Sequence, residues 1–264
     1  MAFVCVGSVR AAPGATTLAL CVAGSWPRPA VLLEADPAGG VLATRYQLGR
    51  TPGLADLAAM VENHAAPAVI WNTAQALPGG LAAVVAPESG DIAAGILNDV
   101  ARPLGQWCAR LGESDVIADC GRVGAGSPAL GLLPAADVVL VVVRPRAEEL
   151  YPAAHRVRNL IQGRMATVGL VLVGSRPYGP KEISAQLGVP VVGVIEDDSR
   201  AAAAIRDGGS ARVLRRSALV RSVQSFVDDL AADLGVETPA EAPPPADPVE
   251  PVGALPHSRE EGVG

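Results

Sequence analysis

Short apolar runs rich in β-branched residues recur along this chain and alternate with alanine-rich stretches of helical character. Runs that are apolar on both faces are typical of parallel strands covered by helices on each side. The composition agrees, because half of the 264 residues are hydrophobic and only 3% are aromatic. The pattern therefore predicts an α/β protein with a doubly wound, mostly parallel β-sheet and helices on both faces. The expected strands are 2–7, 30–35, 67–72, 81–86, 114–120, 137–143, 167–174 and 189–195, and the strongest expected helices are 16–24, 91–111, 147–163 and 217–234.

The segment after the first apolar run has the character of a phosphate-binding loop. Gly7 leads through Gly14 to Thr16 and Thr17, which open the first expected helix. A glycine there lets backbone N–H groups approach phosphate oxygens, and the helix N-terminus adds partial positive charge. The pattern G-x-x-x-x-G-K-[ST] is not met, because the glycine spacing is longer and position 15 is alanine. Taken alone, the segment fits an ordinary β–turn–helix corner nearly as well.

Two carboxylates follow other apolar runs at equivalent places. Asp36 lies in "EADPAGG" (34–40), after the second run, and Asp119 lies in "VIADCG" (116–121). In doubly wound folds ligands bind at the carboxyl ends of the strands. A carboxylate placed there can bind magnesium-bound water beside a γ-phosphate. Each aspartate alone is more often a helix cap or a turn former, but the loop and the two acids in this order form a more specific pattern.

At this point the chain resembles the MinD/ParA-like ATPases, a P-loop class (SIMIBI) whose deviant phosphate loop reads K-G-G-V-G-K-T-T. "EADPAGG" is similar to the family's D-x-D-P-Q-G segment, and "VIADCG" is similar to its second acidic switch. The resemblance extends over roughly residues 1 to 234. The loop positions that match are Arg10, Ala11, Ala12, Pro13, Gly14, Ala15, Thr16 and Thr17.

The resemblance implies a P-loop NTPase-like domain over residues 1–235 that binds ATP and Mg²⁺. In it, Thr16 and Asp119 would hold the metal, and Asp36 would position the attacking water, with Asp119 as the second catalytic acid. The implied function is a homodimeric, nucleotide-dependent switch with weak or slow ATP hydrolysis, acting in chromosome or plasmid partitioning or in positioning a cellular apparatus. Base specificity stays open, because Gly174-Ser175-Arg176 stands where the family often has an asparagine for adenine.

Position 15 is the main departure from the family pattern. Alanine replaces the lysine that grips the β- and γ-phosphates, and losing a charge-assisted contact costs on the order of 2 kcal/mol in binding. Arg10 falls on the signature lysine, which in the family reaches phosphates across a dimer interface, and its planar guanidinium suits phosphate oxygens. The alternative is a catalytically degenerate scaffold or localisation factor on the same fold. A dinucleotide-binding oxidoreductase is a weaker alternative, because no G-x-G-x-x-G follows the first run.

Arginines gather towards the C-terminal part of the expected domain. In ParA-like proteins such arginines bind the DNA backbone without reading sequence, with salt-dependent affinity. A solvated arginine-rich surface is the alternative, with some of the side chains paired to nearby aspartates. The candidates for DNA contact are Arg200, Arg212, Arg215, Arg216 and Arg221.

Residues 236–264 form an acidic, proline-rich tail without periodicity, which is expected to be disordered. Anionic lipid would repel it, so direct membrane insertion by this segment is not expected. The dimer surface or the tail is a candidate binding site for an unidentified protein partner. The four cysteines show no metal-ligand spacing and are expected to be reduced thiols. With no signal-peptide pattern, a cytoplasmic location is expected.

Overall fold

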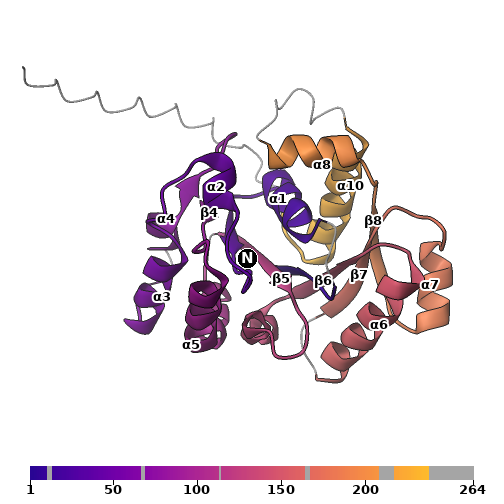
Figure 1. Cartoon of the computed structure of the whole chain (residues 1–264), viewed down its shortest axis with the longest axis horizontal. Helices are drawn as coiled ribbons and strands as arrows, with labels where there is room; N and C mark the ends of the chain where they lie inside the picture. The colour runs from indigo at the N-terminus through magenta and orange to yellow at the C-terminus, as the bar shows by residue number, and fades with distance from the viewer. Residues whose placement is uncertain (11–13, 67–68, 113, 164–166, 208–216, 238–264) are drawn as a thin grey trace, which may run out of the picture.

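A computed structural model describes the chain apart from residues 11–13, 67–68, 113, 164–166, 208–216 and 238–264. Eight strands form one sheet in the order β3-β4-β2-β5-β1-β6-β7-β8 (Figure 1). All neighbouring pairs are parallel except β3 and β4. The strands are β1 (Phe3–Ser8), β2 (Ala30–Glu34), β3 (Gln75–Ala76), β4 (Ala82–Val84), β5 (Asp115–Arg122), β6 (Val138–Val143), β7 (Thr167–Val173) and β8 (Val191–Ile195).

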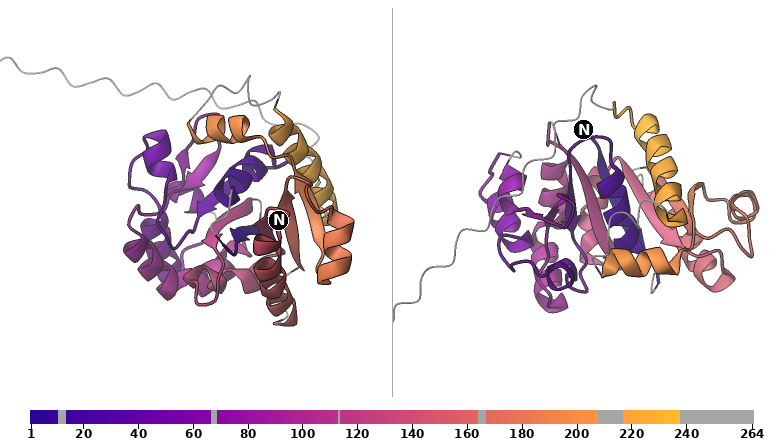
Figure 2. Two further views of the ribbon diagram at one scale, coloured as in Figure 1. Left: turned by 45° about the vertical axis from the view of Figure 1, so that its right-hand side comes forward. Right: turned by 90° about the horizontal axis from the view of Figure 1, so that it is seen from above.

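Helices cover both faces of the sheet, as the sequence predicts. Helices α1, α8 and α10 lie together on one face, and α3, α5 and α6 lie on the other (Figures 1 and 2). The α-helices are α1 (Ala15–Ser25), α2 (Leu42–Tyr46), α3 (Leu54–Glu62), α4 (Ile70–Thr73), α5 (Gly90–Cys108), α6 (Ala147–Gln162), α7 (Pro180–Leu187), α8 (Ser199–Arg206) and α10 (Ala218–Asp233), and the 3₁₀ turns are η2 (Pro128–Gly131) and η3 (Leu133–Ala135).

The core divides into two layers because successive strand residues point to opposite faces. In β1, Phe3 and Cys5 pack under α3, α5 and α6, whereas Val4 and Val6 pack under α1 and α10. All six residues of β1 and all six of β6 are buried. Both faces of each central strand are therefore covered, which explains why these runs are continuously apolar.

Seven of the eight expected strands occur near their predicted positions, and the expected strand at 67–72 is wrong. Ile70–Thr73 forms the short helix α4, and the strand at this edge is Gln75–Ala76, antiparallel to β4. A short apolar run does not distinguish a strand from a buried helical turn by periodicity alone. The four cysteines are free, as expected.

Within the described residues, no helix has both the length and the apolar character that a membrane crossing requires. The predicted tail lies almost wholly outside the described residues, which reach Glu237 beyond the end of α10. The domain boundary at 235 and the disorder of the tail therefore stay predictions.

Packing of α5 against the sheet makes a test of the core. Leu97 is fully buried on this helix, whereas Ile92, one and a half turns earlier, is 57% exposed. We expect Leu97→Ala to lower the free energy of unfolding by about 3 kcal/mol, because it removes buried methyl groups and leaves a cavity. Ile92→Ala should stay within about 0.5 kcal/mol of the unmodified protein. Urea denaturation followed by circular dichroism measures both, and equal effects of the two substitutions would contradict this packing.

Candidate nucleotide-binding site

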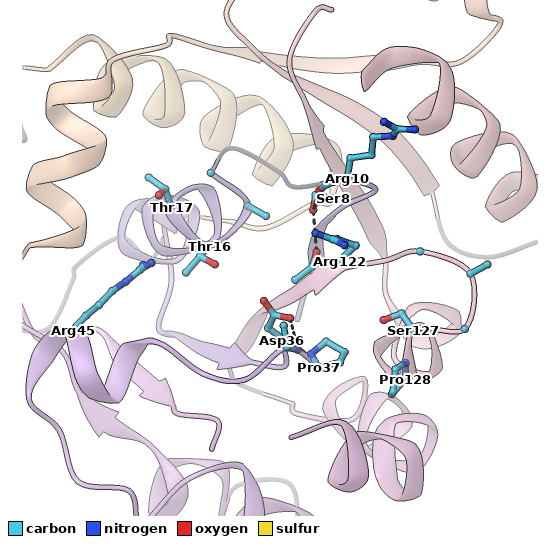
Figure 3. A pocket seen from close by; sticks show the side chains of 17 residues that line it. Ser8, Arg10, Thr16, Thr17, Asp36, Pro37, Arg45, Arg122, Ser127 and Pro128 are labelled. Carbon is cyan, nitrogen blue, oxygen red and sulfur yellow. Dashed lines mark hydrogen bonds between the residues drawn. The ribbon is translucent and has the colours of Figure 1, made fainter. Parts of the chain in front are cut away.

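A cavity of about 630 Å³ lies at the carboxyl ends of the central strands. It is bounded by the end of β1 and the start of α1, by the turn after β2, and by the segment after β5 (Figure 3). These three segments are far apart in the sequence, but β5 pairs with β1 on one side and with β2 on the other. The described loop residues, Arg10 and Gly14–Thr17, consequently line one cavity together with Asp36.

The first turn of α1 presents backbone N–H groups to this cavity. Gly14 precedes the helix with a φ of 95°, a left-handed conformation that favours glycine. The Gly14 carbonyl accepts from the Leu18 amide at 2.7 Å, while the first helical N–H groups have no partner within the helix. Ala15 is buried at this point, and Thr16 and Thr17 are half-buried. Ala11, Ala12 and Pro13 lie outside the described residues.

Asp36 projects into the cavity from the turn after β2. Its Oδ1 accepts from the Ala38 amide at 2.9 Å, which fixes the carboxylate on the turn. In Figure 3 the Asp36 carboxylate and the Thr16 hydroxyl point toward the same central space. Gly121, at the end of β5, lies so close to Asp36 that a side-chain carbon there would overlap the carboxylate. The absence of a side chain at Gly121 therefore provides the space that the Asp36 carboxylate occupies.

Asp119 lies beneath the cavity and does not line it. It is only 1% exposed, and its Oδ1 accepts from the Gly121 amide at 3.1 Å. Burial raises the pKa of Asp119 to about 6, although a hydrogen bond with the Thr16 side chain and the Gly121 amide oppose the rise. The predicted role of Thr16 and Asp119 as ligands of one metal ion stays a prediction.

Glu34 is an acid of the same segment to which the sequence reasoning assigned no role. It is 1% exposed, and its carboxylate accepts from the amides of Val41, Leu42 and Ala86 at 2.7, 3.0 and 2.9 Å. Burial raises its pKa, and these backbone hydrogen bonds lower it. Glu34 thus ties α2 and the end of β4 to the turn that carries Asp36.

Several cavity residues were not singled out from the sequence. They are Ser8 on β1, Arg45 on α2, Arg122 at the end of β5, and the loop Gly124–Pro128. The Ser127 Oγ is buried and has no hydrogen-bond partner among the described residues. The sequence feature that could have indicated this loop is the glycine-rich segment "GRVGAGSP" (121–128). An unsatisfied buried hydroxyl and a glycine-rich wall are features of a polar ligand site.

Arg10 borders the cavity, but its side chain extends away from Thr16 and Asp36 (Figure 3). The predicted DNA-contact residues are placed only in part. Arg200 on α8 and Arg221 on α10 are exposed, whereas Arg212, Arg215 and Arg216 lie outside the described residues. Elsewhere in the same region, Arg206 pairs with Asp207 at 3.1 Å, as the alternative of paired arginines foresaw.

A second cavity of about 360 Å³ adjoins the first. Gly14, Thr17 and Arg45 line both cavities. The second cavity continues over the ends of β7 and β8 to α8, where Asp197 and Asp198 line it. The two cavities together form an elongated site that begins at Asp36 and ends near α8.

Solved structures with the same arrangement of strands and helices identify this architecture. The cell division ATPase MinD of Pyrococcus furiosus superposes with a TM-score of 0.71 and 15% identity, over 88% of this chain and 98% of MinD. The chain has the fold of the MinD and ParA ATPases. A ParA family ATPase from Chlorobium tepidum TLS gives a TM-score of 0.71 at 15% identity, over 87% and 98% of the two chains.

Another neighbour with the MinD/ParA fold is the septum site-determining protein MinD from Pyrococcus horikoshii OT3, whose structure is a complex with Mg-ADP. It gives a TM-score of 0.72 at 12% identity, covering 89% of this chain and 98% of the neighbour. No family model matches the sequence, and no curated protein matches it. The predicted fold is thus confirmed by structural similarity, at identities where sequence comparison finds no relative.

The contact between Gly121 and Asp36 is tested by adding one carbon. Gly121 has a φ of 55°, so Gly121→Ala introduces backbone strain as well as overlap with the Asp36 carboxylate. We expect a loss of about 2 kcal/mol in the free energy of unfolding, measured by urea denaturation. Gly124→Ala is the matched control in the same segment, because no atom lies within 4 Å of its added carbon. A Gly121 variant as stable as this control would contradict the described geometry.

Asp119 gives a pH-dependent prediction. With its pKa raised to about 6, the folded protein binds this proton more tightly than the unfolded chain does. The Asp119 contribution to the free energy of unfolding therefore falls as the pH rises from about 4 to about 6. Asp119→Asn removes this contribution, so the variant should gain on the order of 2 kcal/mol over the unmodified protein between pH 4.5 and pH 8. Urea denaturation at the two pH values measures this, and a pH-independent difference would refute the assignment.

Proposed function

We propose that this chain is a member of the MinD/ParA-like ATPases that binds ATP with Mg²⁺ and works as a cytoplasmic, homodimeric switch with weak or slow hydrolysis. The observation that carries the proposal is the meeting of three segments at one 630 Å³ cavity: the start of α1, Asp36 after β2, and Gly121 after β5. The shared fold supports it.

The residues present fit a triphosphate and a magnesium ion. The N-terminal amides of α1 suit phosphate oxygens, and the unpartnered Ser127 Oγ offers a further polar contact. Among the described residues, no group of three or more His, Cys, Asp or Glu is arranged to hold a metal ion. Mg²⁺ bound with a nucleotide commonly has only one or two protein ligands, its other ligands being phosphate and water. Thr16 would be such a ligand, and Asp119, once ionised, would support the metal from beneath through metal-bound water.

Each side chain then has a defined role. Asp36 would orient water near the terminal phosphate, since its carboxylate is fixed on the Ala38 amide and faces the cavity. Asp119 would hold the Thr16 hydroxyl in place from below. When bound, the metal would neutralise part of the phosphate charge. The second cavity has the position and size to receive the base, with Thr17 and Gly14 at the junction.

Arg10 would act between subunits. Its side chain extends away from the cavity of its own chain (Figure 3), as a residue that reaches the phosphates of a partner subunit would. The resemblance to the family supports this role for the signature position. Exposed Arg200 and Arg221 are proposed as backbone contacts for non-specific DNA, which would show as salt-dependent retardation of duplexes of unrelated sequence.

A catalytically inactive scaffold on the same fold is the second candidate, and one observation favours it. Position 15 carries a buried alanine, so no ammonium group extends from the first turn of α1 to the phosphates. Such a protein would use its dimer surface or its tail to recruit a protein partner.

Equilibrium dialysis against labelled ATP with Mg²⁺, combined with sedimentation, tests the proposal. We expect binding in the micromolar to low millimolar range and a shift toward a dimer. Asp36→Asn should leave binding within about threefold and lower hydrolysis at least about tenfold, because it removes the group that orients water. No binding at millimolar ATP would refute the nucleotide switch and favour the scaffold.

Ala15→Lys discriminates between the two candidates. The substitution returns a cation next to the phosphates, so a weakened but complete site should bind ATP about tenfold more tightly or more. Thr44→Lys is the control, because Thr44 is exposed on α2 and can accept a lysine. A position on α1 such as Ala19 is unsuitable, since it is buried in the core. A variant that hydrolyses no ATP despite tight binding would favour the scaffold.

A further inference from the structure

Arg45 is a cavity residue to which the proposed function assigns no role. It lies on α2, and it lines both the phosphate-side cavity and the base-side cavity. In Figure 3 its side chain extends from α2 toward Thr16 and Thr17 at the start of α1. Its guanidinium therefore approaches, from the opposite wall, the turn of helix in which position 15 carries no charge.

The backbone that carries Arg45 is firmly held. Buried Glu34 accepts hydrogen bonds from the amides of Val41 and Leu42, the two residues at which α2 begins. Leu42 and Ala43 are buried in the layer that packs under α1. The Tyr46 hydroxyl, next to Arg45, donates to the Ile205 carbonyl at 2.8 Å. Side chains mounted on such anchored elements hold a ligand more closely than side chains on free loops.

Within the described part of the chain, the Arg45 guanidinium has no ion pair and no hydrogen bond. The acids near it are engaged elsewhere. Asp197 lies 3.9 Å from the Arg144 Nε, Asp198 accepts from the Ala201 amide at 2.9 Å, and Asp36 accepts from the Ala38 amide. A half-buried guanidinium without an anionic partner, at the junction of two connected cavities, is suited to an anionic ligand.

We propose that Arg45 supplies from α2 the positive charge that position 15 lacks, and that it grips the nucleotide's phosphate chain where the two cavities meet. This inference rests on the proposed nucleotide site. Arg122 lines only the first cavity, and Arg144 and Arg206 line only the second. Unlike these three arginines, Arg45 lies where the two cavities join, beside the phosphates that would link the base to the terminal phosphate. It would replace part of the charge that a lysine at position 15 would supply.

The location of Arg45 also couples binding to the Asp36 segment. Asp36 and Arg45 lie on one continuous stretch after β2, which Glu34 pins at its middle. A phosphate chain held by Arg45 on this anchored helix would therefore be kept at a constant position relative to Asp36. Loss of the terminal phosphate would leave Arg45 with its remaining contacts, so ADP should stay bound.

The test compares nucleotide affinities by isothermal titration calorimetry in the presence of Mg²⁺. We expect Arg45→Ala to weaken ATP and ADP binding roughly 10- to 100-fold, the range for a lost charged hydrogen bond, and to leave adenosine binding unchanged. Arg45→Lys should recover part of the loss. Arg50→Ala is the matched control, because Arg50 follows five residues later, is 82% exposed, pairs with Glu88, and lines neither cavity.

The Ala15→Lys change in the Arg45→Ala background completes the test. If the two cations serve the same phosphates, the double variant should regain ATP affinity to within about threefold of the unmodified protein. Unmodified protein that binds no nucleotide refutes the proposed function itself. Unmodified protein that binds ATP, with Arg45→Ala binding equally well, refutes only the role of Arg45. An equal loss for adenosine and ATP would also overturn that role, because it would show that α2 supports the site without touching phosphate.

Discussion

The position of β5 between β1 and β2 is the constraint on which the whole candidate site depends. Asp119 on β5 lies beside Val6 of β1 and beside Glu34 of β2, and its carbonyl accepts from the Ala35 amide at 2.8 Å. A shift of β5 by one residue would exchange its two faces and turn Asp119 away from Thr16. The buried Asp115 at the start of β5 holds this register, because its carboxylate accepts hydrogen bonds from the Ala2 amide, the Trp26 indole and the Arg28 guanidinium.

Around that strand the site concentrates negative charge. Three acids lie close together here: Glu34 at the end of β2, Asp36 in the turn after it, and Asp119 on β5. The charges of Asp36 and Glu34 help to raise the pKa of Asp119. Glu34 is compensated by three backbone amides, and Asp36 and Asp119 by one each. A polyphosphate adds further negative charge to such a site, so cations are required. The proposed answer is a metal ion at Thr16 and Asp119 together with Arg45.

The missing lysine then has a physical interpretation. In a site gripped from the first turn of α1, alanine at position 15 would remove the main cation. Here the same space is bordered by arginines from three other segments: Arg10 after β1, Arg45 on α2 and Arg122 at the end of β5. A guanidinium that reaches the cavity from the facing wall can make bidentate contacts that an ammonium group cannot. An arginine on the opposite wall of the cavity can therefore supply the positive charge that a lysine at position 15 would supply.

By itself, the sequence determined the doubly wound fold, the order of seven strands, and the places where Gly14, Thr16, Asp36 and Asp119 follow apolar runs. These follow from local periodicity and from the rule that ligands gather at the carboxyl ends of parallel strands. The sequence could not reveal α4, since a short, mostly apolar run such as 67–72 is equally compatible with helix and strand. Nor could it show that Asp119 lies beneath the cavity, that Glu34 pins α2, or that Arg45 faces Thr16. Those relations join residues between 7 and 103 positions apart, and only the tertiary packing of α1, α2 and β5 decides their distances.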